Sequence, residues 1–167
     1  MRIAVLSDTH LASPNHVLVS EFEQVLQPAD ALLHLGDITS ESVLDYLASH
    51  RAFYAVAGNM DSGRWAAELP AKRVVELNGL RVGMLHGAGL GFGNLEAALP
   101  DRFAQENVQL ICFGHTHRRL WQESGGVRLL NPGSFTFPKQ GRPGYALVQV
   151  TSQGDLEVEW RLLEERI

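Results

Sequence analysis

The stretch LICFGHTHR, residues 110–118, joins four apolar residues to a glycine and then to two histidines in alternate positions. Such an apolar run is typical of a short strand that is buried on both faces, as in a parallel sheet. In an extended backbone, alternation points the rings of His115 and His117 to one side and Thr116 to the other. The stretch therefore predicts a buried strand that carries two imidazoles at its carboxyl end.

The same arrangement recurs along the chain. Four other apolar runs have the length of strands, and they occupy residues 3–6, 31–35, 53–57 and 82–85. Amphipathic stretches of helical period, at residues 15–26 and 41–49, separate the first three runs. This βαβαβ order implies parallel strands with helical crossovers.

The pattern changes after the third run. Two alternating runs flank Asn78-Gly79, which is a strong hairpin signal, and a helix is expected at residues 95–105. Further strands are expected at residues 118–124, 127–133, 144–150 and 156–165, the first two joined at Gly125-Gly126. We predict a single α/β domain, residues 1–167, in which two mixed β-sheets pack face to face with helices on the outer faces.

Composition narrows the class of protein. The net charge of −5 gives no support for a nucleic-acid-binding surface. Cys112 is the only cysteine, which excludes an intrachain disulfide and a thiolate-rich zinc site. No apolar segment approaches the length of a membrane span or of a signal-peptide core. We therefore expect a cytoplasmic protein with no membrane partner.

Each strand-like run is followed within a few residues by side chains that can bind a metal ion. Sites of α/β sheets form at the carboxyl ends of strands, where the loops meet. Two carboxylates, one amide and four imidazoles exceed the needs of one ion, whereas two divalent ions about 3.5–4 Å apart that share a carboxylate account for all of them. The candidate metal ligands are Asp8, His10, Asp37, Asn59, His86, His115 and His117.

In this order, the motifs resemble the signature blocks of the calcineurin-like metallophosphoesterases. They read DTH from Asp8, GD from Gly36, GNMD from Gly58, HG from His86 and GHTH from Gly114. The block NPGS, residues 131–134, is similar to a further mark of the small prokaryotic phosphodiesterase branch. The resemblance extends from residue 1 to about residue 150.

This resemblance implies a four-layer αββα sandwich and two metal sites. It assigns Asp8, His10 and His117 to one ion and Asn59, His86 and His115 to the other, with Asp37 bridging. A metal-bridging hydroxide would hydrolyse a phosphodiester bond, and Asn59 and His115 would be the catalytic residues beside it. Oxygen and imidazole donors suit several ions; the resemblance favours manganese, and zinc, iron, cobalt or nickel remain open.

The chain departs from the family at Met60. Much of the family carries a histidine after the asparagine, near the leaving-group oxygen. A thioether cannot donate a proton, and general acid catalysis contributes about 10²–10⁴ in rate. We therefore predict that diesters, or esters with acidic leaving groups, are preferred to simple alkyl phosphates.

Other readings stay open. A monoesterase of the same fold is one alternative, and a non-catalytic metal-binding scaffold that resembles the retromer small subunit is another. A small phosphate-ester substrate is expected, and nucleic acid is not, because family nucleases carry extra DNA-facing domains. The physiological substrate and the oligomeric state are open; the aromatic loop at Phe135 and Phe137 is a candidate pocket wall or contact between copies.

The remaining polar residues are assigned more ordinary roles. We expect His34 to pack inside a strand, and His16 and His50 to be solvated on or near helices, with His16 a remote substitute for the missing acid. Asp61 is assigned no catalytic role and is expected to bind solvent or cap a turn. Two basic residues of the following loop, Lys139 and Arg142, are candidate phosphate contacts, although exposed basic residues usually bind nothing specific.

Overall fold

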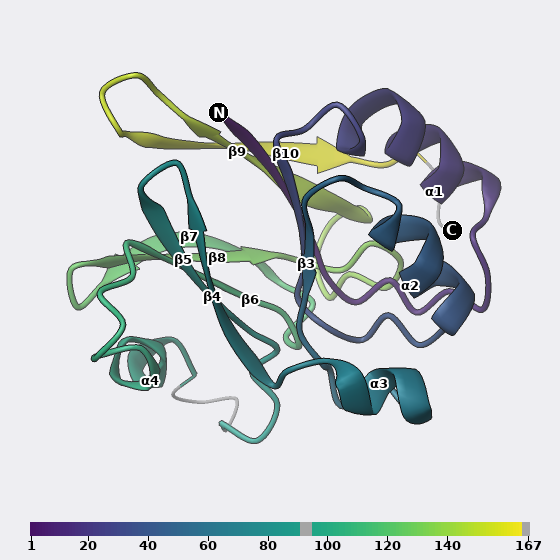
Figure 1. Cartoon of the computed structure of the whole chain (residues 1–167), viewed down its shortest axis with the longest axis horizontal. Helices are drawn as coiled ribbons and strands as arrows, with labels where there is room; N and C mark the ends of the chain where they lie inside the picture. Colours follow the sequence, from purple (N-terminus) through teal and green to yellow (C-terminus); the bar gives the residue numbers. More distant parts are fainter. Residues whose placement is uncertain (91–94, 165–167) are drawn as a thin grey trace.

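Two five-stranded mixed sheets pack face to face in the computed structural model of the chain (Figure 1). The structure describes residues 1–90 and 95–164. The first sheet has the strand order β10-β9-β1-β2-β3 and the second the order β4-β5-β6-β8-β7. The strands are β1 (Arg2–Leu6), β2 (Ala31–His34), β3 (Phe53–Ala55), β4 (Lys72–Leu77), β5 (Leu80–Leu85), β6 (Leu110–Phe113), β7 (Arg119–Ser124), β8 (Val127–Pro132), β9 (Gly144–Val150) and β10 (Leu156–Leu162).

Helices cover the outer face of each sheet. The helices α1 (His16–Glu21) and α2 (Glu41–Ala48) lie beside the first sheet, and α4 (Leu95–Arg102) lies on the far side of the second (Figure 1). The short helix α3 (Arg64–Glu68) follows β3. None of the helices in the described part of the chain has the length and apolar character needed to cross a membrane.

The core follows from the alternation of buried strands. In β1, Ile3 and Val5 belong to the cluster between the two sheets, which also contains Val82 and Leu110 of the second sheet. The alternate residues of β1 pack in a second cluster with Leu18 and Leu47 of the first two helices. A third cluster joins Ile111 of β6 to Leu99 of α4. Three apolar layers therefore separate four layers of secondary structure, which confirms the predicted αββα sandwich.

The hairpin predictions are also confirmed. Asn78 and Gly79 join β4 to β5 with φ values of 49° and 85°. Two consecutive residues with positive φ match the right-handed twist of antiparallel strands. Gly125 and Gly126 make the corresponding turn between β7 and β8.

Several boundaries differ from those expected. The expected helix at residues 15–26 is α1 followed by a π-helical segment, η1 (Phe22–Leu26). The third strand ends at Ala55, the helix of the second half ends at Arg102, and the last strand ends at Leu162; Glu165, the last residue of the expected strand, lies outside the described residues. Helix α3 was missed, because five residues are too few for a periodic signal.

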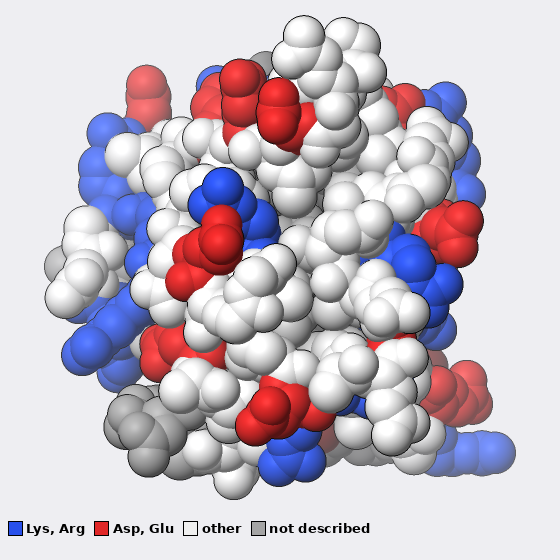
Figure 2. Space-filling model, turned by 90° about the vertical axis from the view of Figure 1, so that its left-hand side faces the viewer, with Lys and Arg blue, Asp and Glu red and all other residues white. Residues whose placement is uncertain are grey.

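The parallel strands determine where the loops meet. β1, β2 and β3 are mutually parallel in the first sheet, as are β5, β6 and β8 in the second. The loops after these strands carry the candidate ligands, so the site draws on both sheets. Acidic and basic side chains are interspersed with uncharged ones on the face that Figure 2 shows.

Candidate metal centre

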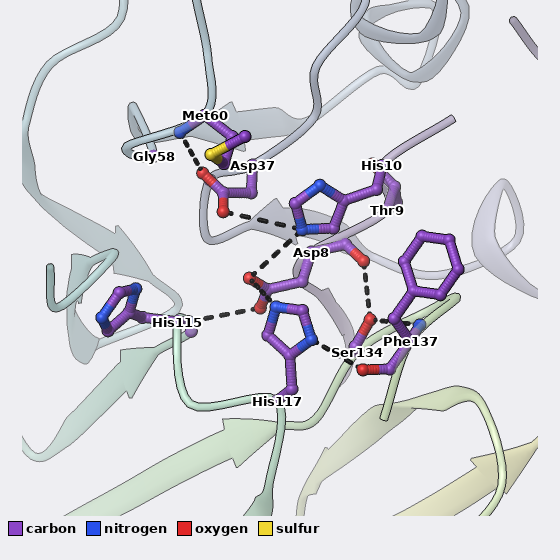
Figure 3. Close-up of polar contacts among 12 residues, drawn as sticks. Asp8, Thr9, His10, Asp37, Gly58, Met60, His115, His117, Ser134 and Phe137 are labelled. Carbon is purple, nitrogen blue, oxygen red and sulfur yellow. Dashed lines mark hydrogen bonds and ion pairs between the residues drawn. The ribbon is translucent and has the colours of Figure 1, made fainter. Parts of the chain in front are cut away.

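Three candidate ligands from distant parts of the chain meet at the carboxyl end of β1. The Nε2 atom of His117 lies 3.1 Å from Oδ1 of Asp8. The Nε2 atom of His10 lies 4.0 Å from the same oxygen. Asp8 is completely buried, and both histidines are partly exposed. Figure 3 shows the rings of His10 and His117 directed at the Asp8 carboxylate. These three residues form a group whose ligand atoms all face one small volume.

A second group lies beside the first. The Oδ1 atom of Asn59 is 3.0 Å from Nε2 of His86 and 3.0 Å from Nδ1 of His115. The Oδ2 atom of Asp37 lies 3.4 Å from Nε2 of His86 and 3.6 Å from Nε2 of His10. One carboxylate oxygen of Asp37 therefore stands between the two groups, so the structure brings together all seven residues singled out from the sequence.

The backbone orients two of the imidazole rings. Nδ1 of His86 lies 2.7 Å from the carbonyl oxygen of Leu35, and Nδ1 of His117 lies 2.7 Å from that of Phe137. A carbonyl only accepts, so each Nδ1 carries the proton of a donor and each Nε2 points its second site into the cluster. Metal-ligating histidines are oriented in this way by a hydrogen bond from the other ring nitrogen.

The donor set fits divalent cations. With Nδ1 protonated, the neutral ring of His86 presents a lone pair to the oxygen of Asn59, and that of His117 presents one to Asp8. Two acceptors about 3 Å apart require an extra proton or a cation between them. In addition, the buried atoms Oδ1 of Asp8 and Nε2 of His10 have no hydrogen-bond partner among the described residues. Buried polar atoms are rarely left in this state.

The close packing of carboxylates and imidazoles also shifts the pKa values of these side chains. Burial opposes charge on His86, but its hydrogen bond to Asp37 and the nearby carboxylates raise the pKa of this ring. The carboxylate of Asp8, which faces the ring, raises the pKa of His117, against burial and the charge of Lys139. Burial lowers the pKa of His10 and of His115. Burial would raise the pKa of Asp37, but the hydrogen bond from His86 and its charge hold it below the usual range.

Five of the seven candidate ligands adopt left-handed backbone conformations. Their φ values are 54° for Asp8, 44° for His10, 56° for Asp37, 68° for His115 and 56° for His117. Such conformations cost roughly 1–3 kcal/mol each in non-glycine residues and cluster at functional sites. The sharp turns direct side chains that follow the strands toward one point. Assembly of the cluster therefore requires an unfavourable backbone conformation at five positions.

Two glycines permit the loops to approach each other. A Cβ atom added to Gly114 would lie 2.0 Å from Oγ of Ser7 and 3.1 Å from Oδ2 of Asp8. A Cβ atom added to Gly58 would lie 2.1 Å from the backbone nitrogen of Asp37. Both positions therefore exclude any side chain.

Asp61 has a larger structural role than the sequence indicated. Its Oδ2 atom accepts hydrogen bonds from the backbone amides of Asp37 and Gly58, at 3.0 and 2.8 Å, and its Oδ1 atom accepts one from Thr39 at 2.8 Å. The carboxylate thus holds the loop after β2 against the loop after β3. The expected turn-capping role extends to joining two loops, which no local signal could reveal.

The NPGS block braces the opposite side of the cluster. Asn131 donates from Nδ2 to the carbonyl oxygen of Gly114 at 2.7 Å and to Thr116 at 3.1 Å. Ser134 donates to the carbonyl oxygen of Asp8 at 2.8 Å. Both residues are buried, so the block is a support for two ligand-bearing loops.

The remaining histidines lie outside the cluster. His34 is fully buried against Thr9 and the backbone amide of Gly36, as predicted, and burial lowers its pKa to about 4. His16 is exposed, as predicted. His50 was expected to be solvated, which is wrong: it is buried, and its ring bridges the backbone of Ala29 and Ala52.

The two phenylalanines of the long loop have different environments. Phe135 is fully buried and stacks on Tyr145, so it neither walls a pocket nor contacts another copy of the chain. Because Phe135 lies in a loop and not in a strand or helix, the local pattern did not indicate that it belongs to the core. Phe137 is 57% exposed, and its ring centroid lies 6.0 Å from that of His10.

Comparisons with known proteins agree with this geometry. The family model of the calcineurin-like phosphoesterase superfamily domain matches residues 1–153. A probable metallophosphoesterase of Methanocaldococcus jannaschii is 30% identical over 165 residues, which cover 99% of this chain and 83% of that protein. A phosphodiesterase of the same archaeon is 25% identical over 146 residues, which cover 80% and 83% of the two chains.

A solved structure supports the fold. Vps29 from Entamoeba histolytica, determined with zinc, superimposes with a TM-score of 0.75 at 23% identity and covers 95% of this chain and 97% of that one. The signature blocks, the two-sheet architecture and the matched family model lead to one conclusion. This chain belongs to the calcineurin-like phosphoesterase superfamily, a family of metal-dependent phosphoester hydrolases, and its archaeal relatives are consistent with the small prokaryotic branch.

Proposed function

We propose that this protein is a binuclear metal-dependent phosphodiesterase that acts on a small phosphate ester. The observation that carries the proposal is the position of Asp37. Its Oδ2 atom lies 3.6 Å from Nε2 of His10 and 3.4 Å from Nε2 of His86, so one oxygen faces both groups of candidate ligands. A shared carboxylate is what a pair of neighbouring divalent ions requires.

The residues divide between two ions. Asp8, His10 and His117 would hold one, Asn59, His86 and His115 would hold the other, and Asp37 would be shared. When bound, the ions supply a nucleophile at neutral pH and neutralise charge on the phosphoryl oxygens. Manganese is the first candidate, with zinc, iron, cobalt or nickel as alternatives, because nitrogen and oxygen donors accept all of these ions.

Asn59 is suited to a direct catalytic role. Its Oδ1 atom faces His86 and His115, which leaves the two N–H bonds of Nδ2 available for other partners. Donors of this kind stabilise charge that develops on the oxygens of a transition state. His115 places its Nδ1 atom beside the same amide oxygen and would act with Asn59 at the reacting phosphate.

Met60 supports the preference for diesters. Its side chain is 57% exposed next to Asn59, and a thioether supplies no proton to a leaving group. His16 does not supply the missing proton donor, because it lines a separate cavity with Glu21 and Arg161. The similarity to an archaeal phosphodiesterase points the same way.

A scaffold function is the second candidate, because the fold resembles that of Vps29. The retained cluster argues against it. A protein used only for assembly has no need of two aspartates and four histidines with their ligand atoms converged and their backbones strained.

The test is to strip the protein of metal and assay it with bis(p-nitrophenyl) phosphate and p-nitrophenyl phosphate after adding manganese, zinc, iron, cobalt, nickel or magnesium. We expect two ions per chain by elemental analysis and a higher kcat/KM for the diester. Asp37→Asn should lower kcat/KM by about 100-fold or more, the scale of losing one electrostatic group at a transition state.

The control is Asp155→Asn, which removes an exposed carboxylate far along the chain and should behave as the wild type. Full activity without metal would contradict the proposed chemistry. Inactivity with every metal and both esters, in a protein that still binds two ions, would favour the scaffold.

A further inference from the structure

A cavity lies beside the loop that carries His115 and His117, on the edge of the metal centre. It has a volume of about 460 Å³ and lies between that loop, the start of β7 and the loop after β8. Its lining residues are Glu96, Thr116, Arg118, Arg119, Leu120, Lys139 and Gln140. Three cationic side chains therefore face one carboxylate, in a chain whose net charge is −5.

The cavity is joined to the candidate ligands by short connections. Thr116 stands between His115 and His117 in the chain. The backbone amide of Lys139 donates to the carbonyl oxygen of His117 at 3.0 Å. The loop that carries two of the candidate ligands thus forms part of the cavity wall.

Arg119 provides the independent sign of a ligand. Its Nε atom is buried and has no hydrogen-bond partner among the described residues, although one terminal nitrogen donates to the carbonyl oxygen of Arg142. The side chain packs against two positions without side chains, Gly133 and Gly141. A buried N–H donor without a partner costs free energy unless a ligand or water satisfies it.

We propose that this cavity is a second anion site, which binds another phosphate group of the same substrate. The inference rests on the proposed function and narrows it. The substrate class becomes phosphodiesters that carry a second phosphate a short distance from the scissile one. Arginine and lysine are the usual partners of such groups, through charge-assisted hydrogen bonds.

The first experiment compares two chromogenic diesters that differ only by one phosphate. These are the p-nitrophenyl ester of thymidine 5′-phosphate and the same compound with an additional 3′-phosphate. We expect a lower KM for the second compound. Arg118→Ala and Lys139→Ala should each reduce the preference for it, measured as the ratio of kcat/KM values, by about tenfold, which is the effect of one charge-assisted hydrogen bond.

Arg128→Ala is the matched control, because this exposed arginine of β8 pairs with Glu123 outside the cavity. Its ratio should equal that of the wild type. A ratio unchanged by both cavity variants would overturn the proposal. Circular dichroism and thermal unfolding establish that each variant is folded before the ratio is compared.

The second experiment separates this inference from the proposed function. Inorganic phosphate is added to ¹⁵N-labelled protein as purified, and the Nε–H resonance of Arg119 is followed by NMR. We expect a saturable shift that is reduced at least severalfold in Arg118→Ala and retained in Arg128→Ala. If neither diester is hydrolysed but the shift is present, the enzyme assignment fails and the anion site stands; if the shift is absent, the anion site is wrong.

Discussion

The backbone amide of Met60 donates a hydrogen bond to Oδ1 of Asp37 at 2.8 Å. Met60, at the position where the resemblance leads one to expect a histidine, is therefore held through its backbone to the carboxylate that faces both groups of ligands. Its side chain is exposed, and Figure 3 shows its backbone nitrogen directed at Asp37. The position is well placed for a proton donor, although methionine is not one.

Met60→His should restore such a donor. We expect the variant to raise kcat for a phenyl or alkyl phosphomonoester by at least about tenfold, within the range of general acid catalysis. Bis(p-nitrophenyl) phosphate should gain less, because p-nitrophenolate leaves without a proton. Steady-state kinetics with the matched variant Met60→Gln, which adds polarity but no acid, checks the result. An equal effect of glutamine and histidine would contradict the assignment.

Asp61→Asn should weaken metal binding without removing a candidate ligand. Its amide group turns an N–H₂ toward at least one of the three backbone amides that now donate to the carboxylate. Changes to groups that orient ligands typically reduce metal affinity about 10–100-fold. Calorimetric titration of the stripped protein measures the loss, with Asp155→Asn as the control; an affinity equal to the wild type would show that these hydrogen bonds do not position Asp37.

Gly114→Ala tests whether the close approach of Ser7, rather than the flexibility of the backbone, requires glycine at position 114. The new Cβ atom would lie 2.0 Å from Oγ of Ser7, so Ser7 or the ligand loop must move. We expect a loss of about 1–3 kcal/mol in the free energy of unfolding, as for overpacked cores, together with weaker metal binding. Urea unfolding gives the first quantity.

Gly79→Ala is the comparison for that experiment. Its φ of 85° disfavours a side chain, but an added Cβ atom meets nothing within 4 Å. This variant should lose about 1 kcal/mol through backbone strain and bind metal as the wild type does. Metal binding that is equally impaired in both variants would reject a specific role for Gly114.

Cys112 should be inert in the folded protein. It is fully buried in the cluster between the sheets, and burial raises the pKa of its thiol, so little thiolate is present near neutral pH. A thiol reagent should label it at least about 100-fold more slowly than in urea-unfolded protein, because labelling requires opening of the core. Rapid labelling without denaturant would show that the two sheets separate readily.

Local patterns in the chain predicted most of the architecture. The run at residues 110–113 is β6, the hairpin at Asn78-Gly79 forms as expected, and both halves of the sandwich follow from the order of apolar runs. These features depend on neighbouring residues, whose periodicity and turn preferences act along the chain itself. Helix α3 and the π-helical end of the first helix left no such local signal.

What the sequence by itself determined is which side chains follow the buried strands, because strand length and the residue after each strand are properties of consecutive positions. Only the tertiary structure decided how they meet. Packing of two sheets sets His115 beside Asn59, 56 residues apart, and the left-handed turns aim the rings. The supports from Asp61, Asn131 and Ser134, and the buried environments of His50 and Phe135, arise from contacts between distant segments, which no local pattern encodes.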